Sequence, residues 1–277
     1  MPLVLREGGG SDPAAPMRVL GIDTATAIGS VGLADDARIV VERSGPAVPA
    51  DGRSGHGGML APLVRRALGD AGWRAADLDA IAVSIGPGSF TGLRVGLGFA
   101  KGLAYAAQAA IAPVPTLDAL AIVADAAPGE FVCPMLDARK GEVYAALYRM
   151  GDSGVLDPLT GCLLARPEVV LEGISGRCRF LGDAVDVHAA AIERAHGAAA
   201  LVLPFSHYHP RGGVVAALGS GLPRLGPEAL GAVEPTYVRP AYVQVGHATR
   251  RQGPDAPGPT RSGSRGGSSA LTTKRAL

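Results

Sequence analysis

The stretch of sequence that decides the fold reads Gly86-Pro87-Gly88-Ser89-Phe90-Thr91-Gly92-Leu93-Arg94-Val95-Gly96-Leu97-Gly98. Residues 81–85, directly before it, form a short apolar run that predicts a buried strand. The glycines and the proline end this strand, and Ser89 or Thr91 can cap a helix by accepting a backbone N–H hydrogen bond. We therefore predict a strand, a tight turn and a helix over residues 91–108.

Small residues recur at every fourth position here, namely Gly88, Gly92, Gly96, Ala100 and Ala104. Side chains four apart share one helix face, so this face is a flat ridge that another backbone can approach closely. Glycine inside a helix costs about 0.5–1 kcal/mol relative to alanine, so the ridge needs a reason. One reason is a phosphate-binding turn, but no Lys-Ser or Lys-Thr pair follows, and the glycine spacing matches neither phosphate motif. The favoured reason is a docking helix, packed on its own sheet on one side and on a partner on another.

Composition limits the class of protein. The chain has 277 residues, of which 47% are hydrophobic and 18% charged, which is enough for one or two domains with a core. The net charge of +1 favours neither nucleic acid nor a membrane surface, and aromatic residues, at 4%, are too few to stack single-stranded bases. Cys133, Cys162 and Cys178 show no paired spacing, and no apolar run reaches membrane-spanning length. These features predict a cytoplasmic protein with reduced thiols.

The first half of the chain predicts the order β-β-β-α-β-α-β-α. The elements are strands at 17–22, 29–34 and 38–42, a helix at 59–71, a strand at 80–85, the helix at 91–108, a strand at 111–114 and a helix at 117–126. This order predicts an α/β fold of the ribonuclease-H-like type, in which helices cover a mixed sheet. Residues 1–16 read as a disordered leader, and Met17 is the expected start of the mature protein.

The second half begins in the same way, with a hairpin of strands 131–136 and 142–148, which indicates a worn internal duplication. Further elements are predicted as a strand at 162–164, a short helix from Pro167, a strand at 179–182, a helix at 185–196 and a strand at 201–203. The expected domains are thus 17–127 and a degenerate 128–246, followed by a disordered tail, 247–277. The tail carries six basic residues against Asp255, and a weak contact with RNA is the minor interpretation of this charge.

Four motifs resemble the TsaB family, the non-catalytic subunits of the bacterial machinery that makes threonylcarbamoyladenosine in tRNA. They are Met17-Arg18-Val19-Leu20-Gly21-Ile22-Asp23-Thr24-Ala25-Thr26, the 86–96 stretch, Leu136-Asp137-Ala138-Arg139 with Gly141-Glu142-Val143-Tyr144, and Glu234-Pro235-Thr236-Tyr237-Val238-Arg239. The resemblance implies two ribonuclease-H-like halves, as in the actin, Hsp70 and sugar-kinase superfamily. It also implies a TsaD-like catalytic partner, a TsaE-like ATPase in the full complex, only indirect contact with tRNA, and no cofactor.

The positions where the superfamily holds phosphate or metal carry unsuitable residues. Ala25 occupies the glycine position of the turn after Asp23, and its methyl group crowds any phosphate. The second turn, Asp137-Ala138-Arg139-Lys140, lacks the small residues that a phosphate would need. The TsaD family holds its metal with a His-x-x-x-His pair, and by motif position Thr116 and Leu120 stand there. A structural reading is favoured for His56, His207 and His209. The rival function is a stand-alone ATP-dependent phosphotransferase or metallopeptidase.

The helix pair 59–71 and 91–108 is the expected partner-binding surface. Close packing of its small residues and the side chains of Leu60, Leu63, Leu93 and Leu97 should supply most of the buried area, with Phe90 and Arg94 as anchors. In the TsaB family the corresponding helices meet those of the partner as a bundle, and the same face would also support a homodimer. The expected partner-binding residues are His56, Leu60, Leu63, Val64, Ala67, Ser89, Phe90, Gly92, Leu93, Arg94, Gly96 and Leu97.

Overall fold

The computed structural model describes residues 16–46 and 55–238. The chain divides into a unit that spans Met1–Ala241 and a second unit, Tyr242–Leu277. The expected leader, apart from Pro16, and the basic tail lie outside the described residues. Within the described ranges, none of the helices combines the length and the apolar character that a bilayer span requires.

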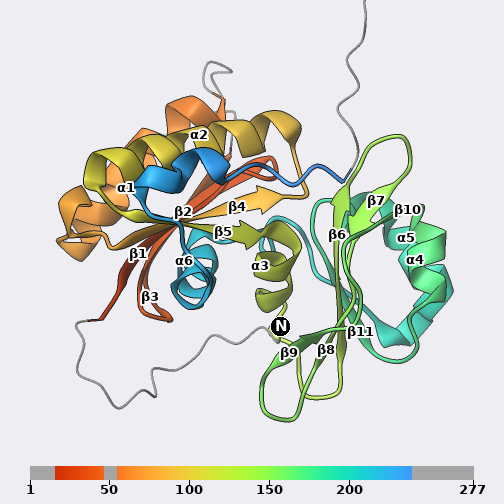
Figure 1. The fold of residues 1–277 in the computed structure, drawn as a ribbon. Helices are drawn as coiled ribbons and strands as arrows, with labels where there is room; N and C mark the ends of the chain where they lie inside the picture. Colours follow the sequence, from red (N-terminus) through yellow and green to blue (C-terminus); the bar gives the residue numbers. More distant parts are fainter. Residues whose placement is uncertain (1–15, 47–54, 239–277) are drawn as a thin grey trace, which may run out of the picture. The chain divides into compact units, whose positions relative to one another are not determined.

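The first sheet has five strands in the order β3-β2-β1-β4-β5. Their bounds are β1 Arg18–Asp23, β2 Ile28–Asp35, β3 Arg38–Pro46, β4 Ala80–Gly86 and β5 Ala110–Pro115. The strand β1 pairs antiparallel with β2 and parallel with β4, while β3 and β5 form the edges. The predicted order β-β-β-α-β-α-β-α is confirmed, and Figure 1 shows this sheet with helices on both faces.

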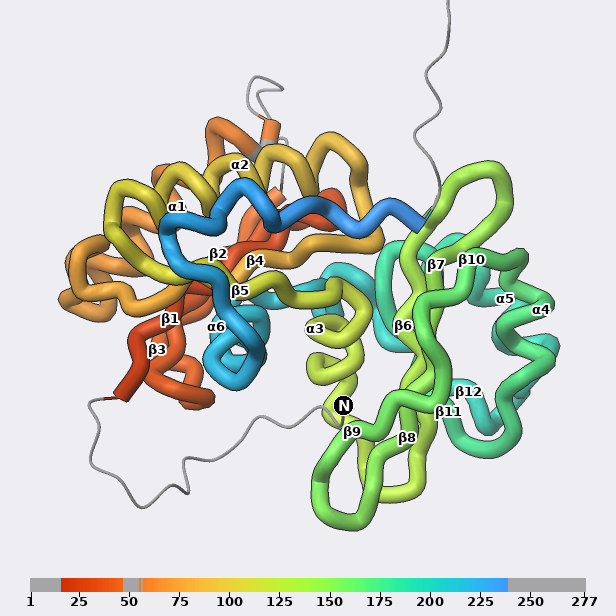
Figure 2. Tube along the Cα trace, in the orientation of Figure 1, coloured from red at the N-terminus to blue at the C-terminus, as the bar shows by residue number. Residues whose placement is uncertain are grey.

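Helices cover both faces of the first sheet because its central strands are apolar on both sides. On one face, α1 (His56–Ala71) and α2 (Phe90–Ala107) pack with the buried side chains of Leu20 and Ile22. On the other face, α6 (Gly212–Gly221) packs with Val19 and Ala82. The tube in Figure 2 shows α6 on the side of the sheet opposite to α1 and α2.

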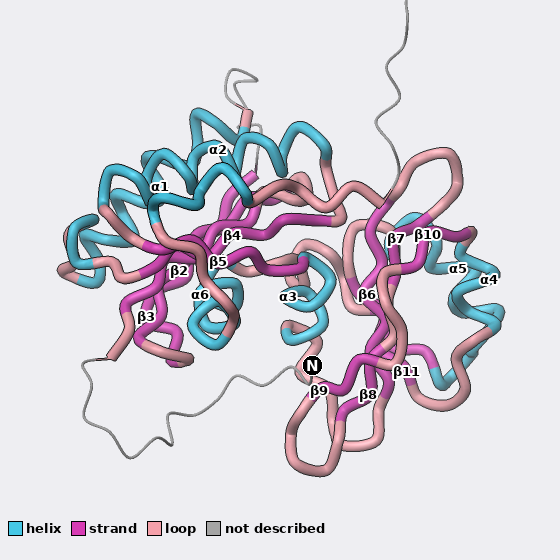
Figure 3. Tube along the Cα trace, in the orientation of Figure 1, coloured by secondary structure: helices cyan, strands magenta, loops and turns pink. Residues whose placement is uncertain are grey.

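The second sheet repeats the strand order of the first. Its main path is β10-β7-β6-β11-β12, with two antiparallel pairs followed by two parallel pairs, as in β3-β2-β1-β4-β5. The bounds are β6 Phe131–Asp137, β7 Val143–Ala145, β8 Tyr148–Met150, β9 Leu156–Pro158, β10 Leu163–Ala165, β11 Cys178–Leu181 and β12 Ala200–Val202. Figure 3 shows α4 (Pro167–Glu172) and α5 (Val185–His196) on one face and α3 (Thr116–Ile122) on the other. This repeated topology agrees with the predicted duplication, and the short strands fit the expected degeneracy.

Three short 3₁₀ helices complete the fold, η1 at Ala75–Asp77, η2 at Gly197–Ala199 and η3 at Pro227–Ala232. Two predicted elements differ from the structure. The helix predicted at 117–126 ends at Ile122, because the chain then tightens and Asp125 takes a positive φ of 48°. The strand predicted at 142–148 is divided into β7 and β8.

The helix α6 was not predicted, and its glycines explain how it fits. A Cβ at Gly21 or Gly32 would collide with the backbone of Gly212 or Gly213, so this helix lies directly on bare strand backbone. Glu42 of β3 accepts the N–H groups of Gly212 and Gly213, at 3.2 and 2.7 Å. The first sheet is therefore completed by a segment that follows the whole second sheet in the sequence.

Candidate functional site

The turn after β1 is closed by its own hydrogen bonds. Asp23 is fully buried, and its Oδ1 accepts the N–H of Ala25 at 3.1 Å. Its Oδ2 has no hydrogen-bond partner among the described residues, and burial raises the pKa of this carboxyl group to about 6. Thr24 Oγ1 donates to the carbonyl of Gly92 at 2.8 Å, which ties the turn to α2.

The turn before α2 packs closely onto this first turn. The N–H of Ser89 donates to the carbonyl of Ala25 at 2.7 Å. A Cβ at Gly88 would lie 2.6 Å from that carbonyl oxygen, so only glycine fits here. Ser89 Oγ accepts the N–H of Gly92 at 3.2 Å and is the cap of α2, which decides between the two predicted candidates. The Ala25 carbonyl is thus engaged by the backbone of the chain itself.

The turn after β6 is built from charged side chains instead. Asp137 Oδ1 accepts the N–H of Arg139 at 2.8 Å, and the guanidinium of Arg139 lies 3.2 Å from the other carboxylate oxygen. Arg139 and Lys140 have positive φ values of 64° and 58°. Asp183 Oδ1 accepts the N–H of Asp137 at 2.9 Å, and burial raises the pKa of Asp183.

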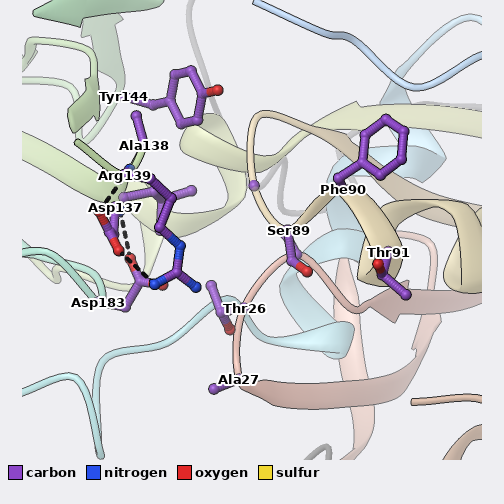
Figure 4. A pocket seen from close by; sticks show the side chains of 13 residues that line it. Thr26, Ala27, Ser89, Phe90, Thr91, Asp137, Ala138, Arg139, Tyr144 and Asp183 are labelled. Atoms are coloured by element: carbon purple, nitrogen blue, oxygen red, sulfur yellow. Dashed lines mark hydrogen bonds and ion pairs between the residues drawn. The ribbon is translucent and has the colours of Figure 1, made fainter. Parts of the chain in front are cut away.

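The two turns line one pocket of about 360 Å³. Figure 4 shows the Arg139 side chain extending from the two aspartates toward Thr26 and Ala27, with the hydroxyl groups of Ser89 and Thr91 on another wall. The carboxylates of Asp137 and Asp183, which also line this pocket, oppose the binding of a phosphate by like-charge repulsion. Within residues 16–46 and 55–238, no three His, Cys, Asp or Glu side chains are grouped so as to hold a metal ion.

The glycine ridge of α2 faces the protein's own sheet. Gly92, Gly96, Ala100 and Ala104 are all buried, and a Cβ at Gly96 would collide with the side chain of Thr24. The docking helix was predicted to pack on its own sheet on one side and on a partner on another. The ridge makes the first of these contacts, since it brings α2 close to β1 and the turn after it.

The expectation that the apolar side chains of α1 and α2 present a surface is wrong for most of them. Seven of the expected partner-binding residues are buried within this chain, because the helix faces that carry them cover the first sheet. These are Leu60, Val64, Ala67, Gly92, Leu93, Gly96 and Leu97. Leu63 is half-buried, whereas Ser89, Phe90 and Arg94 are exposed. His56 begins α1, and its side chain lies outside the described structure.

The outer face of α2 has a different set of small residues. Gly98 and Gly102 are exposed, and a Cβ at either would meet no atom within 4 Å. Val95, Phe99 and Leu103, which neighbour them along the helix, pack on the core and are only partly buried. Gly98 and Gly102 are four residues apart in the sequence, which predicts a shared helix face. The same spacing at Gly92 and Gly96 led to the other face being chosen as the docking ridge.

Residues 233–238, which we name the C-terminal strap, return to the start of α2. The N–H of Thr236 donates to the carbonyl of Ile85 at 2.7 Å, and Tyr237 reaches Phe90 and Arg94. The motif 234–239 thus has a structural role that the sequence did not reveal, and Arg239 lies outside the described residues.

The histidines fit the favoured structural reading in part. His207 Nδ1 lies 2.9 Å from Ser206 Oγ in an exposed turn. His209 is buried, the edge of its ring meets Phe205, and burial lowers its pKa. Neither ring nitrogen of His209 has a hydrogen-bond partner in the described part of the chain.

Known proteins resemble this chain in sequence and in fold. A family model described as "TsaD: tRNA N6-adenosine threonylcarbamoyltransferase" matches residues 35–194. The tRNA threonylcarbamoyladenosine biosynthesis protein TsaB of Escherichia coli is 37% identical over 157 residues, which cover 56% of this chain and 65% of that protein. TsaB of Bacillus subtilis is 32% identical over 170 residues, which cover 60% of this chain and 73% of that protein. The chain is a member of the TsaB family.

A solved structure has the same fold. YeaZ from Pseudomonas aeruginosa matches with a TM-score of 0.65 and 26% identity, over 80% of this chain and 100% of that chain. The α/β architecture of two ribonuclease-H-like halves is therefore shared with a protein of known structure.

The positions where the TsaB resemblance places the metal-binding pair of the catalytic relative have structural roles here. Thr116 is fully buried, and its Oγ1 accepts the N–H of Gly86 at 3.1 Å. Leu120 lies in the core between α3 and the second sheet. Both positions are thus used for packing and for holding the turn that precedes α2.

Proposed function

We propose that this chain is a non-catalytic subunit that binds and activates a TsaD-like threonylcarbamoyltransferase in the synthesis of threonylcarbamoyladenosine in tRNA. A TsaE-like ATPase completes the proposed complex, and tRNA is reached through the partner. Membership of the TsaB family supports the pathway, since the relatives from Escherichia coli and Bacillus subtilis are both named as biosynthesis proteins for this modification.

The observation that carries the binding role is the outer face of α2. Two exposed glycines in the interior of one helix cost stability, at about 1 kcal/mol each relative to alanine, and no described residue lies close enough to either position to require a glycine there. A partner helix requires them, because the absence of side chains at Gly98 and Gly102 permits close approach. The partly exposed Val95, Phe99 and Leu103 supply the apolar area beside this contact.

A non-catalytic role is supported by the residues at the positions where the superfamily holds phosphate and the catalytic relative holds a metal. The N–H of Ser89 occupies the carbonyl of Ala25, and Thr116 and Leu120 contribute a hydroxyl group and an alkyl group where the catalytic relative uses imidazoles. In this proposal the chain acts by binding the active conformation of its partner more tightly than the inactive one.

The test is calorimetric titration of the full chain with the TsaD-like protein of the same organism. Gly102→Glu places a charged side chain on the outer face of α2, and we expect at least a tenfold weaker Kd. The matched control is Gly69→Glu, an exposed glycine of α1 that also has open space around it. Glutamate favours helix more than glycine does, so both variants should fold. Equal affinities for the two variants, or turnover of Mg-ATP by the chain alone, would contradict the proposal.

The same surface accounts for a homodimer that competes with the partner. Analytical ultracentrifugation of the wild type and of Gly102→Glu measures this directly, and we expect any dimer to dissociate in the variant. Leu97 is one of the expected partner-binding residues, but a charged substitution there cannot test binding. The side chain is buried in the core, so Leu97→Arg would unfold the protein.

A further inference from the structure

Three side chains from two distant segments form a small cluster at the start of α2. The guanidinium carbon of Arg94 lies 3.8 Å from the centre of the Phe90 ring and 5.7 Å from that of Tyr237. The two rings are 5.2 Å apart, and Arg94 Nε donates to the Tyr237 hydroxyl at 2.9 Å. Phe90 and Tyr237 are each 40% exposed, and Arg94 is exposed as well.

This cluster fixes the Arg94 side chain before any partner arrives. One face of the guanidinium stacks on Phe90, and Nε is held by a hydroxyl whose chain segment is in turn fixed by the bond from Thr236 to Ile85. A long side chain that is already ordered loses less conformational entropy when it binds. Such preorganised arginines, next to aromatic rings, are the typical centres of protein interfaces.

Arg94 has no acidic partner in the part of the chain that the structure describes. Among the described residues, no carboxylate lies within ion-pair distance of it, whereas Arg43, Arg74, Arg139 and Arg179 each have one. The Nε position is used by Tyr237, and no described residue accepts a hydrogen bond from the two terminal NH₂ groups. These two groups are suited to the fork-like contact that arginine makes with a carboxylate.

We propose that Arg94 binds a carboxylate side chain of the protein that docks on the outer face of α2, with Tyr237 as the residue that positions it. This inference rests on the proposed function, because Arg94, Gly98 and Gly102 are spaced four apart and share one helix face. The contact combines a close helix approach at the glycines with one charged pair at the end of the helix.

A carboxylate fits the surroundings better than a phosphate of nucleic acid. The groups that contact Arg94 are the rings of Phe90 and Tyr237, and no other cation joins the cluster in the described structure. Residues 239–277 hold seven of the 26 Lys and Arg residues and one of the 25 Asp and Glu residues, so residues 1–238 carry an excess of acids. A phosphate backbone needs several cations on one surface.

The experiment measures the Kd of the full chain for the TsaD-like protein at several NaCl concentrations. We expect Arg94→Gln to weaken binding by at least tenfold and to reduce the salt dependence, because the charged pair is lost. Arg94→Lys keeps the charge but lacks the two terminal NH₂ groups of the guanidinium, and should give a loss of affinity between those of the wild type and Arg94→Gln. Tyr237→Phe keeps the ring but not the hydroxyl, and should weaken binding about threefold.

The control is Arg66→Gln, which removes an exposed arginine one turn before Asp70, on the side of α1 that faces β3. Thermal unfolding checks that each variant is folded. If Gly102→Glu prevents binding but Arg94→Gln binds like the wild type with the same salt dependence, this inference is wrong and the proposed function stands. If the wild type does not bind the TsaD-like protein, the proposed function itself fails. If Arg94→Gln weakens only the binding of tRNA, the ligand is a phosphate and the carboxylate assignment is overturned.

Discussion

In the spatial order of both sheets the fourth strand, β4 or β11, ends at or directly before a glycine with a positive φ, 117° at Gly86 and 108° at Gly182. After Gly86, the turn packs backbone on backbone, with the N–H of Ser89 on the carbonyl of Ala25. After Gly182, the side chain of Asp183 makes the equivalent contact by accepting the N–H of Asp137. The duplicated fold thus kept the glycine and changed the closure: the first turn is joined to the start of α2 through the backbone, while the second turn places acidic groups at the pocket that both turns line.

The largest effect that tests this comparison is expected at Gly88. Gly88→Ala places a Cβ 2.6 Å from the carbonyl oxygen of Ala25 at a φ of 154°, and we expect the free energy of unfolding to fall by about 3 kcal/mol. Urea unfolding measures this change. Gly98→Ala is the control within α2, where open space predicts a gain of about 0.5–1 kcal/mol. Similar stabilities for the two variants would show that the first turn is not closed.

Asp23 in the first turn and Asp183 in the second predict a difference in how stability depends on pH. Burial raises the pKa of Asp23 from 3.8 to about 6, so the folded state binds its proton more tightly than the unfolded state. This stabilisation is fully present below pH 4 and is lost as the pH rises through 6. Asn cannot titrate, so the stability of the wild type relative to Asp23→Asn should fall by up to about 3 kcal/mol from pH 4 to pH 7.5.

Asp183→Asn is the matched variant in the second turn. Burial raises the pKa of Asp183 as well, so the sign is the same, but its partial exposure predicts a smaller change. Urea unfolding at each pH gives both profiles. Profiles of Asp23→Asn and wild type that run parallel would show that Asp23 does not titrate in this range.

The second sheet is joined to α3 by one hydrogen bond that can be removed. Tyr148 Oη donates to Asp118 Oδ1 at 2.6 Å, and Tyr148 is almost fully buried. We expect Tyr148→Phe to lower the free energy of unfolding by about 2 kcal/mol, since a carboxylate loses its partner in a buried place. Tyr144→Phe in β7, whose hydroxyl group has no hydrogen-bond partner among the described residues, is the control and should change stability by less than about 0.5 kcal/mol.

The smallest effect is expected at the helix start after each glycine turn. Ser89 caps α2, whereas α5 begins after Ala184 without a side-chain cap. Ser89→Ala should lower the free energy of unfolding by about 1 kcal/mol, measured by thermal unfolding. No change would mean that α2, like α5, is held by packing alone.

The first half of the fold could be predicted because its elements are locally encoded. Apolar runs bounded by glycine and proline gave β4 and β5, and the amphipathic stripe of Leu60, Val64 and Leu68 gave α1. The helix α6 escaped prediction because it is buried on every side and so has no polar face. Its glycines match the strand backbones of Gly21 and Gly32, which are almost two hundred residues away.

The candidate surface could be predicted only as a helix pair. Periodicity identifies residues that share a face, but the neighbour of that face depends on the tertiary structure. Gly92 and Gly96 therefore looked like a docking ridge and instead pack on Thr24 in the turn after β1, while Gly98 and Gly102 are exposed. The contact between Arg94 and Tyr237 joins residues 143 apart, and no local pattern encodes it.

The late position of α6 in the chain has a consequence for biosynthesis. While the ribosome is still translating the second sheet, one face of the first sheet has no helix to cover its apolar side chains, such as Val19 and Ala82. That face is completed only after Gly221 has left the exit tunnel, so the nascent chain exposes an apolar surface while residues 116–221 are being synthesised. A fragment that stops at residue 127 should accordingly aggregate or recruit chaperones rather than behave as a domain.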